Sequence, residues 1–402
     1  MGEAAAVELG PLHGRLVVDL SRALAGPHAA MMLADMGARV IKVESPGGDD
    51  SRGWGPPFVD PADGERPEAT YFLSANRNKE SLVLDLKTDD GHEVLTSLVR
   101  RADVLIENFR PGVLERLGFS APVLFALNPG LVVLSITGFG HDGPEASRAG
   151  YDQIAQGESG LMSLTGSGPT DPQKIGVPIC DLLAGMNGAS GVLAALLDRE
   201  RTGRGQLVRT SLLAAGVSVH AFQGTRWTVG AEVPRSAGNH HPSIAPYGMF
   251  RCRDGAVQMA VGSPQLWRRF CEAFGFDATQ PGFVTNDERV RNREALIVQV
   301  EAVFAPTPSE ELLSRLSDAG IPAGRVRTLD DVYAWDQVES QGLKVVADHA
   351  RLGRVTLPGP PLRFFDTDET ETTKACHLAP PVLGADSDAI REWLLGPPTP
   401  PA

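Results

Sequence analysis

Short apolar runs alternate with helix-like segments through the first third of the chain. Five of these runs are typical of buried strands: RLVVDL (15–20), RVIKVE (39–44), SLVLDL (81–86), DVLIEN (103–108) and LVVLSIT (131–137). Between the first two runs, Pro27 suits the first turn of a helix and Gly37 suits its end, and Thr88 can cap a later helix. Strands that alternate with helices predict an α/β fold, a doubly wound parallel sheet with helices on both faces.

The pattern changes after about residue 230. The segments YGMFRC and AVQMAV flank Arg253-Asp254-Gly255 and predict a hairpin. Three helices are expected next, at about 264–274, 286–304 and 309–318, and short strands follow from about 340 before a closing helix at 387–395. We therefore expect a large domain formed by residues 1–225 and 336–402, and a smaller α+β domain formed by residues 226–335.

Charge and cysteine usage exclude several classes of protein. The 402 residues carry a net charge of −13, which argues against a nucleic-acid partner. The pair His240-His241 has no metal-ligand spacing, so no metal is expected. Free thiols of a reducing compartment are expected because no CxxC pair or zinc spacing occurs among the cysteines Cys180, Cys252, Cys271 and Cys376.

Targeting and membrane signals are weak in this sequence. The N-terminal stretch MGEAAAVELG lacks the basic region and apolar core of a secretory signal. No apolar run approaches the roughly 20 residues that span a bilayer. We therefore expect a cytoplasmic protein with no membrane partner.

Basic and amide side chains gather after consecutive predicted strands. SANRNK (74–79) is one group, ENFRPG (107–112) is a second, and Arg116 follows it. Ligands of doubly wound sheets bind beyond the carboxyl ends of the strands, where Arg and Lys suit phosphates. A solvated surface is the alternative. GFGHDG (138–143) matches GxGxxG but leads into Pro144 and a polar stretch, so we interpret it as a loop rather than a nicotinamide site.

Asp181 stands among apolar neighbours in GVPICDLLAG (176–185). A helix is expected to follow it, with Gly203 as its end. Asp181 can therefore be a helix cap, because its oxygens would accept free backbone N–H groups there. It can also be a reactive carboxylate. Its neighbour Cys180 has no marked partner base, so a buried structural thiol is favoured over a nucleophile.

Ordered blocks along nearly the whole chain resemble the class III CoA-transferases. The blocks are LSRALAGPHAAMMLADMGARVIKVESPGGDDSR, YFLSANRNKESLVLDL, ADVLIENFRPGVLERLG, SITGFGHDGP, AGYDQIAQGESGLMSLTG and GVPICDLLAG. The family includes enzymes that use formyl-CoA, carnitine-CoA and succinyl-CoA. WGPPF, the NRNK block, AGYDQIAQ and HPSIAPY look most like succinyl-CoA:glutarate CoA-transferase and related dicarboxylate enzymes.

This resemblance implies an activity and a set of site residues. CoA would pass from an acyl-CoA, succinyl-CoA by analogy, to an acid such as a dicarboxylate, with Asp181 as the nucleophile that forms aspartyl anhydride and aspartyl-CoA intermediates. CoA would be a substrate rather than a bound cofactor, and the chain would form an interlocked homodimer. His241 and Tyr247 are candidates for the acid pocket. The matching CoA-binding positions are Leu24, Ala25, Asn76, Arg77, Asn78, Lys79, Asn108, Phe109, Arg110 and Arg116.

The sequence also departs from parts of the family. Ser45 stands where the formyl-CoA enzyme has an arginine, and the stretch Val261 to Gln265 lacks the glycine run of that enzyme's protective loop. Related α-methylacyl-CoA racemases use a histidine where this chain has Tyr151, whose phenol is a poor base. A racemase remains the alternative activity, and a CoA-binding protein without catalysis is a third possibility.

Overall fold

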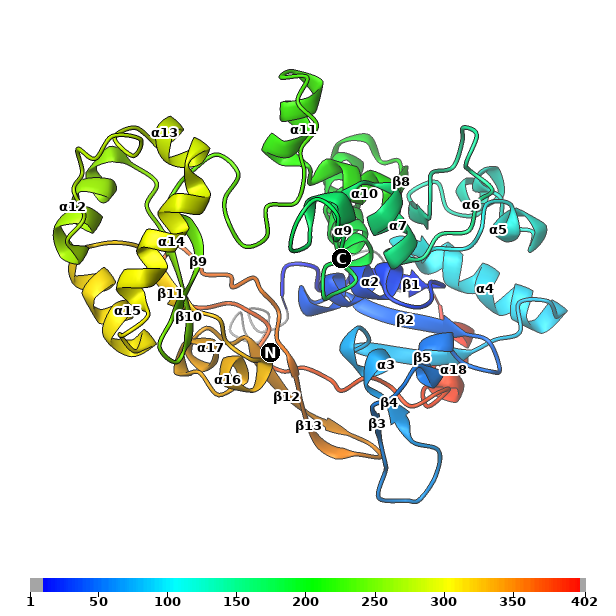
Figure 1. Cartoon of the computed structure of the whole chain (residues 1–402). Coiled ribbons are helices and arrows are strands. Elements are labelled where there is room, and N and C mark those ends of the chain that lie inside the picture. Colours follow the sequence, from blue (N-terminus) through cyan, green and yellow to red (C-terminus); the bar gives the residue numbers. More distant parts are fainter. Residues whose placement is uncertain (1–9, 398–402) are drawn as a thin grey trace. The chain divides into compact units, whose positions relative to one another are not determined.

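The computed structural model describes residues 10–397, which form two compact units (Figure 1). The first unit comprises residues up to Leu161, residues Ile175–Thr225 and residues from Asp336 onward. The second comprises Met162–Lys174 and Arg226–Trp335. Residues 1–9, which include most of the N-terminal stretch considered as a secretory signal, and residues 398–402 lie outside the described part.

A parallel sheet of six strands is the centre of the first unit, and every neighbouring pair in it is parallel. Across the sheet the strands are β5 (Lys79–Val83), β2 (Arg39–Glu44), β1 (Leu16–Asp19), β6 (Val104–Glu107), β7 (Val132–Thr137) and β8 (Leu207–Ser211). The chain starts in the middle at β1 and builds outward first to one edge and then to the other. This order confirms the predicted doubly wound sheet.

Helices cover both faces of this sheet, each over its own apolar core (Figure 1). One face carries α2 (Ala25–Asp35), α7 (Asp152–Glu158), α9 (Ile179–Thr202) and α10 (Leu212–Ser218). The other carries α4 (Asp89–Arg101), α6 (Ala121–Leu127) and α18 (Ser387–Leu395). Thr88 caps α4 as predicted, since its hydroxyl accepts from the backbone N–H of Gly91 at 3.1 Å.

Smaller elements complete the first unit. They are the 3-10 turn η1 (Asp50–Gly53), β3 (Phe58–Val59), β4 (Glu68–Ala69), α3 (Thr70–Ser74), α5 (Val113–Arg116), α17 (Asp336–Ser340), β12 (Lys344–His349) and β13 (Gly353–Pro358). β8 was not predicted from the sequence, because apolar and polar residues alternate only weakly in LVRTS. In the structure β8 pairs with β7 at the edge of the sheet. The strand expected at 81–86 lies instead at Lys79–Val83, where Lys79 pairs with Val40.

The second unit contains a three-stranded antiparallel sheet in the order β11 (Ala323–Arg325), β10 (Gly255–Ala260), β9 (Tyr247–Cys252). The hairpin of β9 and β10 was predicted. Its helices are α12 (Pro264–Phe274), α13 (Asn286–Arg291), α14 (Arg293–Phe304), α15 (Ser309–Asp318) and α16 (Leu329–Tyr333). Two more helices, α8 (Leu161–Leu164) and α11 (Ala221–Thr228), include the sequence positions at which the chain passes from one unit to the other.

The prediction of a single helix at 286–304 is wrong, because Asn292 separates this stretch into the two helices α13 and α14. Asn292 leaves the helical conformation at φ −101° and ψ 26°, and its side-chain amide donates to the carbonyl of Gly282 at 2.9 Å. This competing hydrogen bond ends α13 and starts α14.

Helix α9 corrects the statement that no apolar run approaches membrane-spanning length. By length and composition alone its 24 residues could cross a bilayer. In the structure its buried side chains, including Ala184, Val192 and Leu196, pack in the same core as α2 and β7. Its apolar composition is explained by this central position in the first unit.

Gly185 allows α2 and α9 to pack with their backbones in close approach. A Cβ atom at Gly185 would lie 2.6 Å from the carbonyl oxygen of Ala25 and 3.1 Å from the ring of His28. The start of α2 therefore lies directly against the first turns of α9. Because Leu24 caps α2 and Ala25 begins it, this packing places both residues beside α9.

Gly185→Ala is expected to lower the free energy of unfolding by about 1–3 kcal/mol, because the added methyl group overlaps a backbone oxygen that cannot rotate away. Urea unfolding would measure the change. Gly47→Ala is the matched control, since the only other atom near its Cβ is the Ser45 hydroxyl at 3.9 Å. Equal stabilities of the two variants would contradict the close packing of α2 on α9.

Candidate active site

Asp181 lies in the first turn of α9, but it does not cap the helix. The N-cap position is occupied by Pro178, which offers no side-chain acceptor. Asp152 of α7 supplies the acceptor instead: its Oδ1 atom accepts from the backbone N–H of Cys180 at 2.8 Å and from that of Asp181 at 3.3 Å. Within residues 10–397 the Asp181 carboxylate itself accepts no hydrogen bond. The simple cap interpretation of Asp181 is therefore wrong.

The surroundings of Asp181 favour its protonated form. Burial, together with the negative charge of Asp152, raises the pKa of Asp181 to about 7. Burial and the same two carboxylates raise the pKa of Tyr71 to about 12, so the phenol keeps its proton. Asp181 is therefore a half-buried carboxylate whose ionised form is disfavoured by its surroundings. This is expected of a functional group rather than of a structural ion.

Tyr71 and Trp54 are functional candidates that the sequence analysis did not single out. The Tyr71 ring lies edge-on to the Trp54 ring, with centroids 5.0 Å apart and planes at 79°. Tyr71 belongs to the block YFLSANRNK and Trp54 to WGPPF, so both lay in stretches that carried the family resemblance. The electrostatic interaction of Tyr71 with Asp181 became visible only in the folded chain.

Cys180 is a poor nucleophile in this structure. Its side chain is buried, and burial raises the pKa of its thiol to about 11. A thiolate is needed for attack or metal binding. The geometry thus agrees with a structural thiol. A group of three or more metal-ligating side chains is absent from the described residues.

The segment Asn76–Lys79 is buried, although its side chains were predicted to bind CoA. The Lys79 ammonium donates to Asp19 Oδ2 at 2.9 Å, to the carbonyl of Pro27 at 2.8 Å and to Asn76 Oδ1 at 2.9 Å. Burial lowers its pKa to about 8 despite the Asp19 charge. Lys79 therefore ties β1, the start of α2 and the Asn76 turn together.

Arg77 and Asn78 are also engaged within the first unit. The Arg77 guanidinium pairs with Asp35, with 2.9 Å between Nε and Oδ1. The Asn78 amide donates to Asp35 Oδ1 at 2.9 Å and accepts from the backbone N–H of Leu378 at 2.7 Å. These side chains have a structural role in the fold. A CoA contact by this segment stays a prediction.

The second predicted group follows β6 and is more exposed. Asn108 forms two hydrogen bonds of 2.8 Å with the backbone N–H and C=O of Arg22, which fixes the loop before α2. Arg110 and Arg116 are exposed, and neither forms an ion pair within the described part of the chain. Their guanidinium groups therefore have no carboxylate partner in the described chain, and a contact with CoA stays a prediction for both.

A cavity of about 110 Å³ lies beside the carboxyl end of β6, along β7 and against the first half of β8. Phe109 and Arg110 line it together with Arg209 and His141, which the sequence analysis did not single out for this role. In its wall Ser135 connects Glu107 and His141: the Ser135 hydroxyl donates to the Glu107 carboxylate and lies 2.7 Å from His141 Nε2. Arg209 was missed because the strand that carries it was missed.

The two residues predicted for the acid pocket, His241 and Tyr247, belong to the second unit. Their rings stack with centroids 5.0 Å apart. The backbone N–H of His241 donates to the backbone carbonyl of Tyr247 at 2.9 Å. Arg293 donates to the His241 carbonyl at 2.8 Å. His241 and Tyr247 are thus one local cluster.

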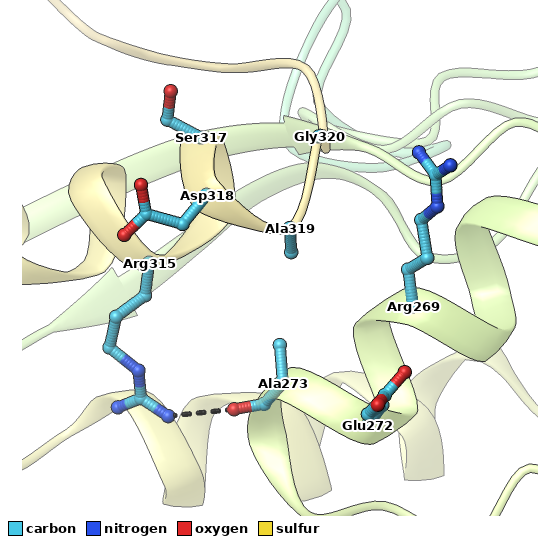
Figure 2. A pocket seen from close by; sticks show the side chains of 8 residues that line it. All are labelled: Arg269, Glu272, Ala273, Arg315, Ser317, Asp318, Ala319 and Gly320. Atoms are coloured by element: carbon cyan, nitrogen blue, oxygen red, sulfur yellow. Dashed lines mark hydrogen bonds between the residues drawn. The ribbon is translucent and has the colours of Figure 1, made fainter.

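A wide surface depression of about 610 Å³ also lies in the second unit (Figure 2). Its lining mixes the cations Arg269 and Arg315 with Glu272 and Asp318, and Arg315 is held by the Ala273 carbonyl at 2.9 Å. None of the predicted site residues lines it. The mixed charges give this depression no preference for an anionic ligand.

The chain belongs to CoA-transferase family III, whose family model matches residues 12–387. It is 42% identical over 343 residues to a succinate–glutarate CoA-transferase of Agrobacterium fabrum, covering 83% of this chain and 84% of that protein. It is 34% identical over 394 residues to the human succinyl-CoA:glutarate CoA-transferase, covering 96% and 89%. The crystal structure of a CaiB/BaiF family protein from Brucella suis matches with a TM-score of 0.84 at 40% identity, covering 96% and 99%. The class expected from the sequence is thereby confirmed.

Proposed function

We propose that the protein transfers CoA from succinyl-CoA to a dicarboxylic acid, with Asp181 as the nucleophile. The observation that carries this proposal is the Asp181 carboxylate at the start of α9, which accepts no hydrogen bond in the described chain and lies beside the Asp152 charge. The substrates are suggested by the similar proteins, whose names specify succinyl-CoA with glutarate.

The reaction begins when the ionised Asp181 carboxylate attacks the thioester carbonyl of the donor. The C–S bond breaks, which gives a mixed anhydride and CoA thiolate. The thiolate attacks the aspartyl carbonyl and releases succinate, so the enzyme now carries an aspartyl-CoA thioester. The acceptor carboxylate repeats both steps in reverse order and leaves as its CoA thioester. Covalent catalysis retains the acyl activation that hydrolysis would lose, provided that water is kept away.

Substrate binding is proposed on two groups of residues. Phe109 offers an apolar contact to CoA, and Arg110 and Arg116 offer charge to its phosphates. Leu24 and Ala25 are buried, so they would contact CoA mainly through their backbone. The segment Asn76–Lys79 would add contacts mainly through the backbone, because its side chains are already bonded. His241 and Tyr247 remain the proposed acid pocket, and the interlocked homodimer and cytoplasmic location remain predictions.

The test is a chromatographic exchange assay. The protein is incubated with succinyl-CoA and each of a panel of mono- and dicarboxylic acids. One or two dicarboxylates are expected to yield a new CoA thioester in equal amount to the succinate released. If succinyl-CoA stays intact with every acid, the proposed donor is wrong. Deuterium uptake at the α-carbon of a 2-methylacyl-CoA would then establish the racemase alternative.

A further inference from the structure

Asp152 and Gln156, both on α7, hold the chain where it enters α9. Asp152 Oδ1 accepts from the backbone N–H groups of Cys180 and Asp181, and its Oδ2 accepts from the Gln156 amide at 2.6 Å. Gln156 is buried, and its Oε1 accepts from the backbone N–H of Ile175 at 2.8 Å. The same pair of side chains therefore fixes both the approach to α9 and its first turn.

This arrangement leaves two carboxylates at one helix terminus with different hydrogen bonding: Asp152 accepts the backbone N–H groups and Asp181 does not. The free N–H groups of a helix N-terminus normally stabilise the nearest carboxylate. Here Asp152 takes them, although it is 29 positions from Asp181 in the sequence. Asp181 lies in the first turn yet receives none of these hydrogen bonds. Paired carboxylates whose environments differ in this way commonly have separate tasks.

We propose that Asp152 is a positioning residue of the transferase, which occupies the N-terminus of α9 so that the Asp181 carboxylate has no hydrogen-bond donor and keeps its nucleophilicity. This inference rests on the proposed function. A carboxylate that accepts backbone hydrogen bonds is more stable and therefore attacks a thioester more slowly. Asp152 removes that stabilisation without touching the substrate.

The negative charge of Asp152 also destabilises the ionised Asp181 carboxylate. The titratable groups around Asp181 are Asp152 from α7, the Tyr71 phenol from α3 and the neighbouring Cys180 thiol. Helix α2 presents His28 at Gly185, and burial lowers the pKa of that imidazole to about 4, so it is neutral. No titratable side chain occurs on α10, whose sequence is LLAAGVS. Asp152 is therefore the negative charge that opposes ionisation of Asp181.

The test compares the pH dependence of kcat/KM for Asp152→Asn, Asp152→Ala and Asp152→Glu with that of the wild type. Asn keeps an acceptor oxygen but loses the charge. The acid limb of the kcat/KM profile, where activity falls as Asp181 is protonated, is therefore expected to move down by about one pH unit. We also expect kcat at pH 8.5 to fall about tenfold. Ala also frees the N–H groups for Asp181, so both changes should be larger. Glu keeps the charge, and its acid limb should stay at the wild-type position. Asp198→Asn, which removes a charge near the other end of α9, is the matched control and should behave as wild type.

An acid limb that follows the charge at position 152 supports the inference. An acid limb unchanged in both the Asn and Ala variants, with native circular dichroism, overturns it and leaves the transferase proposal intact. If Asn or Ala fails to fold, the Glu variant decides: a displaced acid limb would contradict the inference. The proposed function fails separately, if the wild type exchanges no CoA or if Asp181→Asn retains exchange.

Discussion

Asp181→Asn is expected to abolish CoA exchange and to make the folded chain more stable at pH 8. The amide has no anionic oxygen for attack on the thioester, so a loss of about a thousandfold or more is expected. The same substitution removes a charge that the fold disfavours. Loss of activity alone would follow from many defects, whereas loss with increased stability identifies a functional carboxylate.

The stability effect has a defined pH window. The pKa of Asp181 is raised from 3.8 to about 7 in the folded chain, so the folded state binds the extra proton between these values. Its favourable contribution is complete below about pH 4 and is lost as the pH rises through 7. The Asn variant never ionises, so at pH 8 it should be more stable by about 2–4 kcal/mol, and near pH 4 the two proteins should be equally stable. Urea unfolding at both pH values measures this, and a stability difference that does not depend on pH would contradict the raised pKa.

Lys42→Met is expected to lower the free energy of unfolding by about 3–5 kcal/mol. Lys42 is fully buried, its ammonium lies 2.8 Å from Asp49 Oδ2, and it donates to the Ser21 carbonyl at 2.9 Å. Although burial opposes its charge, Asp19, Asp49 and Glu44 raise its pKa. Removal of the cation leaves these buried carboxylates with too little compensating charge. The loops after β1 and β2 should loosen first, because Asp49 also accepts from the backbone N–H of Ala23.

Arg391→Met is the matched control for this prediction. It breaks an exposed ion pair with Asp90, at 2.8 Å between Nη2 and Oδ2, and should change stability by less than about 1 kcal/mol. Urea unfolding of both variants at pH 7.5 provides the comparison. If both variants lose the same small amount, the buried cluster contributes less than its geometry implies.

The sequence assigned the candidate site residues to their elements but could not show their connections. Residues near one another in sequence, such as the start of α9 around Asp181, could be assigned to an element because local patterns determine helices and strands. The partner of that helix start, Asp152, could not be assigned, since nothing local links positions 152 and 181. Likewise Lys79 was interpreted as a ligand for phosphate, because a sequence does not show whether a cation is already paired with a buried Asp19.

By itself, the sequence determined the doubly wound α/β sheet, the hairpin of β9 and β10 and the family, and it singled out Asp181 as a candidate. These follow from alternation of apolar residues, turn residues and ordered blocks, which are properties of short stretches. Only the tertiary structure decided which carboxylate receives the free N–H groups of α9 and which is left without them. The reason is that desolvation and charge pairing depend on groups brought together from distant positions, and they control the pKa of Asp181.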